Sequence, residues 1–102
     1  MKARERRRHM LKHNTYYEGR VQSIGFERYG LEATVGVIAP GEYHFGTGKP
    51  ERMTVVSGEL FAKLPGEADF RAFPAGTSFE IPGKMGFDVK ANQPSAYLCE
   101  FL

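Results

Sequence analysis

The sequence predicts an all-β fold, a small barrel built as a single domain. Twelve glycines and six prolines punctuate the chain. After Asn14 they separate short segments rich in Val, Ile, Thr, Phe and Tyr, which are the residues favoured in strands. No segment after Asn14 has a helical repeat of useful length. A length of 102 residues allows one compact core and leaves no room for a second domain.

The expected strands are short, and most are bounded by glycine or proline, as in small barrels and sandwiches. The segment PGEAD predicts a turn between two strands, because proline presets one backbone dihedral and glycine supplies the unusual one. Ser57 and Gly58 predict a tight hairpin between the strands on either side. In order, the expected strands cover residues 19–26, 31–38, 41–45, 52–57, 59–64, 70–73, 77–81, 86–89 and 96–101.

The first residues differ in charge from the rest of the chain. Residues 1–12 hold six of the fourteen Lys and Arg residues and one of the twelve acidic residues, which leaves a net charge of −3 on the remainder. We therefore divide the chain into a basic N-terminal extension, residues 1–13, and a barrel domain, residues 14–102. Clustered arginines attract phosphates. Because no aromatic residues are interleaved, we expect a frayed helical or disordered extension and no nucleic-acid partner.

The remaining composition favours a cytoplasmic protein with no membrane partner. No apolar run approaches the roughly 20 residues of a membrane-spanning helix, and the arginine-rich start lacks the apolar stretch of a secretory signal. The single cysteine, Cys99, excludes an intrachain disulfide, which suits a reducing compartment. It lies in the largely apolar run AYLCEFL, and we interpret it as a small buried hydrophobic residue.

The stretch GEYHFGTGKPERMTVVSGEL is similar to the first metal-binding motif of cupin barrels, in which two histidines one residue apart precede a glutamate. Glu51 keeps its place and His44 stands for the first histidine, but Gly46 replaces the second. In the second cupin motif, Phe87 stands where a histidine is expected. A catalytic transition metal generally needs at least three protein ligands. We therefore predict no bound metal.

A barrel without a metal still has a cavity, and strand alternation predicts what faces it. If His44 points inward, Tyr43 and Phe45 face the other side. The result is a cavity with carboxylates, an imidazole, a thioether and an aromatic ring, which suits a flat polar ligand. The side chains expected to face inward are those of Glu42, His44, Glu51, Met53, Val55, Ser57, Phe87 and Val89, with Gly46 leaving space.

Four stretches resemble a known family, the small bacterial cupin proteins described as pyrimidine/purine nucleoside phosphorylases. They are YYEGRVQSIGF, VGVIAPGEYHFGTGKPERMTVVSGEL, FEIPG and SAYLCEFL, and they span nearly the whole chain from Tyr16 onward. The resemblance implies a cupin-like barrel of the jelly-roll type. It also implies that inorganic phosphate attacks the anomeric carbon of purine and pyrimidine nucleosides, releasing free base and a pentose 1-phosphate without an organic cofactor.

Such a reaction needs a site for phosphate, a carboxylate near the sugar and a donor for the departing base. Glu51 is the first candidate for the carboxylate and Glu42 the second, and His44 is the candidate general acid because imidazole titrates near neutral pH. Arg52 is the candidate phosphate ligand, unless it forms a surface ion pair. The other candidate substrate-binding residues are Thr54 as a neutral donor, Met53, and the aromatic residues Tyr43, Phe45, Phe87 and Tyr97, whose rings are also suited to a core or a dimer interface.

Two alternative functions are compatible with the same cavity. One is a non-enzymatic sensor or binding module for a small molecule, and the other is a metal-dependent oxygenase. Release of free base only in the presence of phosphate distinguishes the phosphorylase from both. We also expect a homodimer, because pairing of edge strands between two barrels stabilises a domain of this size.

Overall fold

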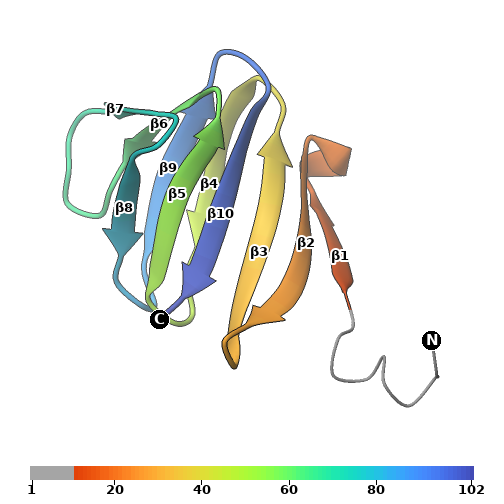
Figure 1. Cartoon of the computed structure of the whole chain (residues 1–102). Coiled ribbons are helices and arrows are strands. Elements are labelled where there is room, and N and C mark those ends of the chain that lie inside the picture. The colour runs from red at the N-terminus through yellow and green to blue at the C-terminus, as the bar shows by residue number, and fades with distance from the viewer. Residues whose placement is uncertain (1–10) are drawn as a thin grey trace.

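The computed structural model describes residues 11–102, and these form ten strands and one short 3₁₀ turn (Figure 1). The basic segment at residues 1–10 lies outside the described residues. The described chain contains no helix with the length and apolar character of a membrane span. The elements are β1 (Lys12–Tyr16), η1 (Tyr17–Gly19), β2 (Val21–Arg28), β3 (Leu31–Ile38), β4 (Gly41–Gly46), β5 (Glu51–Ser57), β6 (Glu59–Lys63), β7 (Arg71–Pro74), β8 (Ser78–Ile81), β9 (Gly86–Ala91) and β10 (Ser95–Phe101).

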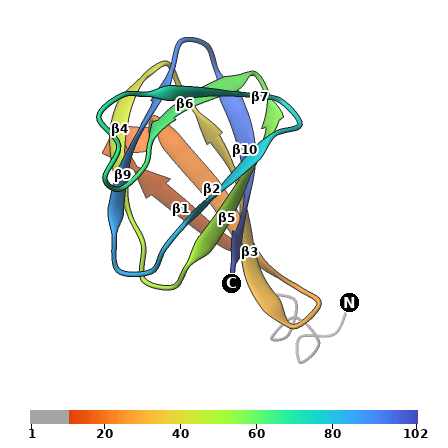
Figure 2. The same cartoon turned by 90° about the vertical axis from the view of Figure 1, so that its left-hand side faces the viewer.

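The strands form two antiparallel sheets that face each other across a common interior (Figure 2). The six-stranded sheet has the order β1-β2-β3-β10-β5-β8, and the four-stranded sheet has the order β4-β9-β6-β7. No strand pairing in residues 11–102 joins the two sheets, and the barrel is therefore not a closed ring of paired strands. The prediction of an all-β fold is confirmed, and its barrel is an open one.

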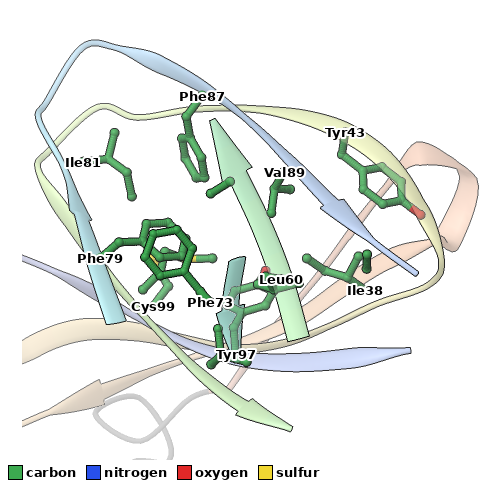
Figure 3. Packing of buried hydrophobic residues seen from close by; sticks show 14 of the residues in the cluster. Ile38, Tyr43, Leu60, Phe73, Phe79, Ile81, Phe87, Val89, Tyr97 and Cys99 are labelled. Atoms are coloured by element: carbon green, nitrogen blue, oxygen red, sulfur yellow. The ribbon is translucent and has the colours of Figure 1, made fainter. Parts of the chain in front are cut away.

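The hydrophobic core fills much of the space between the two sheets (Figure 3). Ile38, Leu60 and Val89 are completely buried, and burial of such side chains is the main favourable contribution to folding. The aromatic ring of Phe79 packs against Phe73 with the ring centroids 4.5 Å apart. Side chains from both sheets meet in this cluster, and their packing therefore sets the distance between the sheets.

The predicted strands agree with the observed ones in most places. The strand at residues 31–38 has the predicted bounds, and the predicted turn at 65–69 connects β6 to β7, which pair with each other. The predicted hairpin at Ser57 and Gly58 is wrong, because β5 and β6 lie in different sheets. Gly58 has a φ of +78° there, and so the turn exists but carries the chain from one sheet to the other.

The first strand was not predicted. Residues 12–16, KHNTY, form β1, which pairs with β2 at the edge of the six-stranded sheet. The predicted boundary at residue 13 therefore falls inside a strand. The segment has no apolar alternation, and four of its five residues are exposed. Its backbone pairing with β2 defines the strand, and no burial pattern in the sequence could reveal it.

Candidate functional site

A cavity of about 460 Å³ lies between the sheets. On the six-stranded sheet, β5 contributes Glu51 and Met53 to its lining, and β10 contributes Tyr97 and Cys99. Phe45, from β4 of the other sheet, also lines it. Apolar side chains therefore surround a small number of polar groups, which is the usual make-up of a site for a small organic ligand.

Glu51 is the carboxylate of the cavity, and it is half-buried. The Sγ atom of Cys99 donates a hydrogen bond of 3.2 Å to Oε1 of Glu51. Burial raises the pKa of Glu51, and this hydrogen bond opposes the rise. Burial and the adjacent Glu51 together raise the pKa of Cys99. The thiol is therefore a neutral donor that orients the carboxylate, and it is not poised to act as a nucleophile.

Tyr97 lies across the six-stranded sheet, over Gly36 of the neighbouring strand β3. A Cβ atom at position 36 would overlap Cζ and Oη of the Tyr97 ring, so a glycine is needed for the ring to take this position. Tyr97 is 6% exposed, and burial raises the pKa of its hydroxyl. The phenol therefore stays neutral in the cavity, and one face of its ring is covered by the backbone of β3.

Tyr17, in η1, connects the two sheets on one side of the cavity. Its hydroxyl donates a 2.6 Å hydrogen bond to the His44 carbonyl and accepts a 3.0 Å bond from the His44 N–H. These are backbone groups of β4, an edge strand of the four-stranded sheet. Tyr17 and Glu18 have φ values of 53° and 56°, a left-handed conformation that costs a non-glycine residue about 1–2 kcal/mol. The two hydrogen bonds help to offset this cost.

The predicted inward orientation of His44 and Glu42 is wrong. Tyr43 is 2% exposed and Phe45 lines the cavity, so the alternation of β4 has the opposite phase. The side chain of His44 is 64% exposed, with Nδ1 at 2.8 Å from Oδ1 of Asp88 on the outer face. Burying the two aromatic rings removes more apolar surface from water than burying a carboxylate and an imidazole, and this decides the phase.

The predicted phase of β5 is correct from Glu51 to Val55, since Met53 and Val55 are buried. Ser57, which was expected to follow them inward, is exposed. The pairing of β5 with β10 shifts register between Ala96 and Tyr97. This irregularity interrupts the alternation at the end of the strand, where Val56 and Ser57 are both exposed.

The structure brings only part of the predicted site together. Arg52 lies on the outer face, where Nε is 3.2 Å from Glu80 and Nη1 is 3.6 Å from Glu100. Thr54 shares that face, being two residues from Arg52 on the same strand. The cavity is lined by Glu51, Met53, Phe45 and Tyr97 and by part of His44, but not by Glu42, Arg52, Thr54, Tyr43 or Phe87.

Several lining residues were not identified from the sequence. Ser23 and Thr34 place hydroxyl groups in the cavity, and Tyr16 and Phe101 add aromatic rings. Alternation along β2 and β3 could have identified such residues. Ser23, for example, follows the buried Val21 by two residues and therefore faces the same side of the sheet. No Lys or Arg side chain in residues 11–102 lines the cavity. Nor does the described chain contain a group of three or more His, Cys, Asp and Glu side chains placed to hold a metal ion.

Comparison with solved structures identifies the fold. A protein of unknown function from Vibrio parahaemolyticus matches with a TM-score of 0.87 and 48% identity, covering 90% of this chain and 98% of that one. An RmlC-like cupin from Shewanella frigidimarina matches with a TM-score of 0.71 at 18% identity, covering 90% of this chain and 83% of the other. The second likeness concerns the fold alone, and it confirms the prediction of a cupin-like architecture.

Comparison with sequences gives closer relatives. A protein from Anaeromyxobacter sp. (strain Fw109-5) is 70% identical over 91% of this chain and 89% of its own length. One from Sorangium cellulosum (strain So ce56) is 64% identical over 91% of this chain and all of its own. Both carry the name pyrimidine/purine nucleoside phosphorylase. The family model of that description matches residues 11–101. The chain therefore belongs to the pyrimidine/purine nucleoside phosphorylase family.

Proposed function

We propose that this protein is a nucleoside phosphorylase that uses the cavity between its sheets as the active site. The observation that carries the proposal is Glu51, a half-buried carboxylate inside a cavity of about 460 Å³ with apolar and aromatic walls. The names of the relatives agree with this activity. The substrates are purine and pyrimidine nucleosides together with inorganic phosphate.

In this reaction an oxygen of phosphate forms a bond to C1′ of the sugar while the bond from C1′ to the base nitrogen breaks. The electron pair of that bond leaves with the base, which takes up a proton from solvent water. Positive charge develops on the sugar in the transition state, as in glycoside hydrolysis. A carboxylate at Glu51, held by the Cys99 thiol, stabilises that charge in surroundings of low dielectric constant.

Release of free base tests this activity. The protein is incubated with uridine or inosine, with and without phosphate, and free base and pentose 1-phosphate are quantified by chromatography. We expect both products only when phosphate is present, in equal amounts and from both nucleosides. Base release that is independent of phosphate, or no release from either nucleoside, would contradict the proposal.

A binding module without chemistry is the second candidate. One observation favours it: no Lys or Arg side chain of the described chain lines the cavity, although cationic side chains are the usual ligands of phosphate. In the same experiment, saturable nucleoside binding with no turnover in the presence of phosphate would support this function over the phosphorylase.

The proposal includes a homodimer. The outer face of the six-stranded sheet exposes the apolar side chains of Ile24, Val35 and Val37. Val35 pairs directly with Ile24 across β2 and β3, so the exposed apolar groups are contiguous. Burial of such a surface against a second copy supports association. The cytoplasmic location stays a prediction.

A further inference from the structure

The cavity contains two buried hydroxyl groups whose hydrogens have no acceptor in the described part of the chain. The Tyr97 hydroxyl makes no hydrogen bond to residues 11–102. Every completely buried polar side-chain atom among these residues has a hydrogen-bond partner. Oη of Tyr97 is therefore not completely buried, and it is open to the cavity that Tyr97 lines. Ser23 is 5% exposed, and its Oγ accepts a 3.3 Å hydrogen bond from Nδ2 of Asn14. Its own hydrogen remains free to donate.

These hydroxyls lie on the same surface of the cavity. Gly36 pairs with Tyr97 on one side and with Ser23 on the other, so the three residues form one row across β10, β3 and β2. Residues in such a row point to the same face of the sheet. Because Gly36 has no side chain, the phenol lies over β3 and extends in the direction of Ser23. The Glu51 carboxylate lies outside this row, paired with Phe101 at the end of β10. It lines the same cavity as the two neutral donors, and after burial its charge is one of the causes that raise the pKa of Tyr97.

We propose that Tyr97, Ser23 and Glu51 form the subsite for the vicinal hydroxyls of the pentose. This inference rests on the proposed function, because it assigns one part of a nucleoside to the cavity. A sugar hydroxyl both accepts and donates hydrogen bonds, and a diol therefore matches two donors beside a carboxylate. The role of Tyr97 is to donate from its hydroxyl, and its buried ring does not stack on the base.

The other two parts of the substrates fit this surface poorly. Phosphate is an anion, and the row has no cation and shares its cavity with the Glu51 carboxylate, which would repel it. If fixed buried donors contacted the edge of the base, they would select one base over the others, since a site built for one hydrogen-bonding pattern rejects another. A site that accepts purines and pyrimidines must direct such groups to what the substrates share, and that is the pentose.

Calorimetric titration without phosphate tests the subsite, because no turnover then occurs. Uridine, inosine and 2′,3′-dideoxyuridine are titrated into the wild-type protein and into the variants Tyr97→Phe and Ser23→Ala. Tyr29→Phe is the matched control, since Tyr29 is 91% exposed on the turn after β2 and lines no part of the cavity. The thermal unfolding midpoint of each variant establishes that it is folded.

We expect Tyr97→Phe to weaken binding of uridine and inosine by the same factor, roughly three- to tenfold for the loss of one neutral hydrogen bond. Binding of the dideoxynucleoside should change by less than twofold. Ser23→Ala should have the same pattern, and Tyr29→Phe should match the wild type. Equal weakening of all three ligands, or unchanged binding of all three, would overturn the subsite alone. A wild-type protein that binds none of them would overturn the proposed function as well.

Discussion

Replacing Glu51 by glutamine is expected to lower kcat/KM for phosphorolysis by about 10²–10³-fold, the usual cost of removing one group that stabilises transition-state charge. The amide has nearly the same size as the carboxylate and can still accept a hydrogen bond from the Cys99 thiol. The loss should therefore arise from the missing negative charge and not from a changed cavity. The measurement is steady-state kinetics with uridine at saturating phosphate.

Glu80→Gln provides the matched control for this variant. Glu80 is a carboxylate on the outer face of the six-stranded sheet, with its side chain 61% exposed and paired with Arg52. Its replacement should leave kcat/KM within about twofold, because exposed ion pairs contribute little. Wild-type kinetics in Glu51→Gln, with the fold intact, would remove Glu51 from the mechanism.

The pH profile gives a second signature of the same group. Burial raises the pKa of Glu51, and the proposed role needs the ionised form. Activity of the wild type should therefore fall as the pH decreases through this raised pKa, at a higher pH than for an exposed glutamate. The residual activity of Glu51→Gln should lack that acidic limb.

The second large effect is expected at Gly36. Changing it to alanine adds a Cβ that would overlap the Tyr97 ring, and the ring can only move away from β3 toward the cavity. We expect nucleoside affinity to fall by more than tenfold because the phenol then occupies ligand space. The free energy of unfolding should decrease by about 1–3 kcal/mol, the usual range for overpacking.

Gly48→Ala is the control for this change. A Cβ at position 48 meets no atom within 4 Å, and its φ lies outside the left-handed region. Its affinity for uridine should equal that of the wild type, as measured by calorimetry, with stability measured by urea denaturation. Wild-type affinity in Gly36→Ala would contradict the position assigned to Tyr97.

The sequence predicted the strands better than it predicted the site. Alternation and turn residues located the strand at 31–38 and the turn at 65–69, because both signals are local. Alternation alone leaves two phases for each strand, and the analogy with a metal site favoured the wrong phase for β4. The phase of β4 is instead set by burial of the apolar surface of Tyr43 and Phe45. In β5 the same analogy gave the right phase, because Met53 and Val55 supply the apolar surface beside Glu51.

Contacts between distant residues account for the rest of the site. Cys99 was predicted to be buried and is 4% exposed, but its hydrogen bond to Glu51 joins residues that are 48 positions apart. The position of Tyr97 depends on the absence of a side chain at Gly36, which is its cross-strand neighbour. Neither relation has a local signal, since both follow from the register of β10 against its neighbours.

The most direct test of the account is whether a nucleoside binds between the sheets, and the methionines provide the probe. Met53 lines the cavity and is 2% exposed, whereas Met85 lies on the turn before β9 and is 46% exposed. The protein is labelled with ¹³C at the methionine methyl groups and titrated with uridine, and the methyl resonances are followed by NMR. The account predicts a saturable shift of the Met53 methyl and none of the Met85 methyl. Saturable uridine binding that leaves the Met53 resonance unchanged would contradict it.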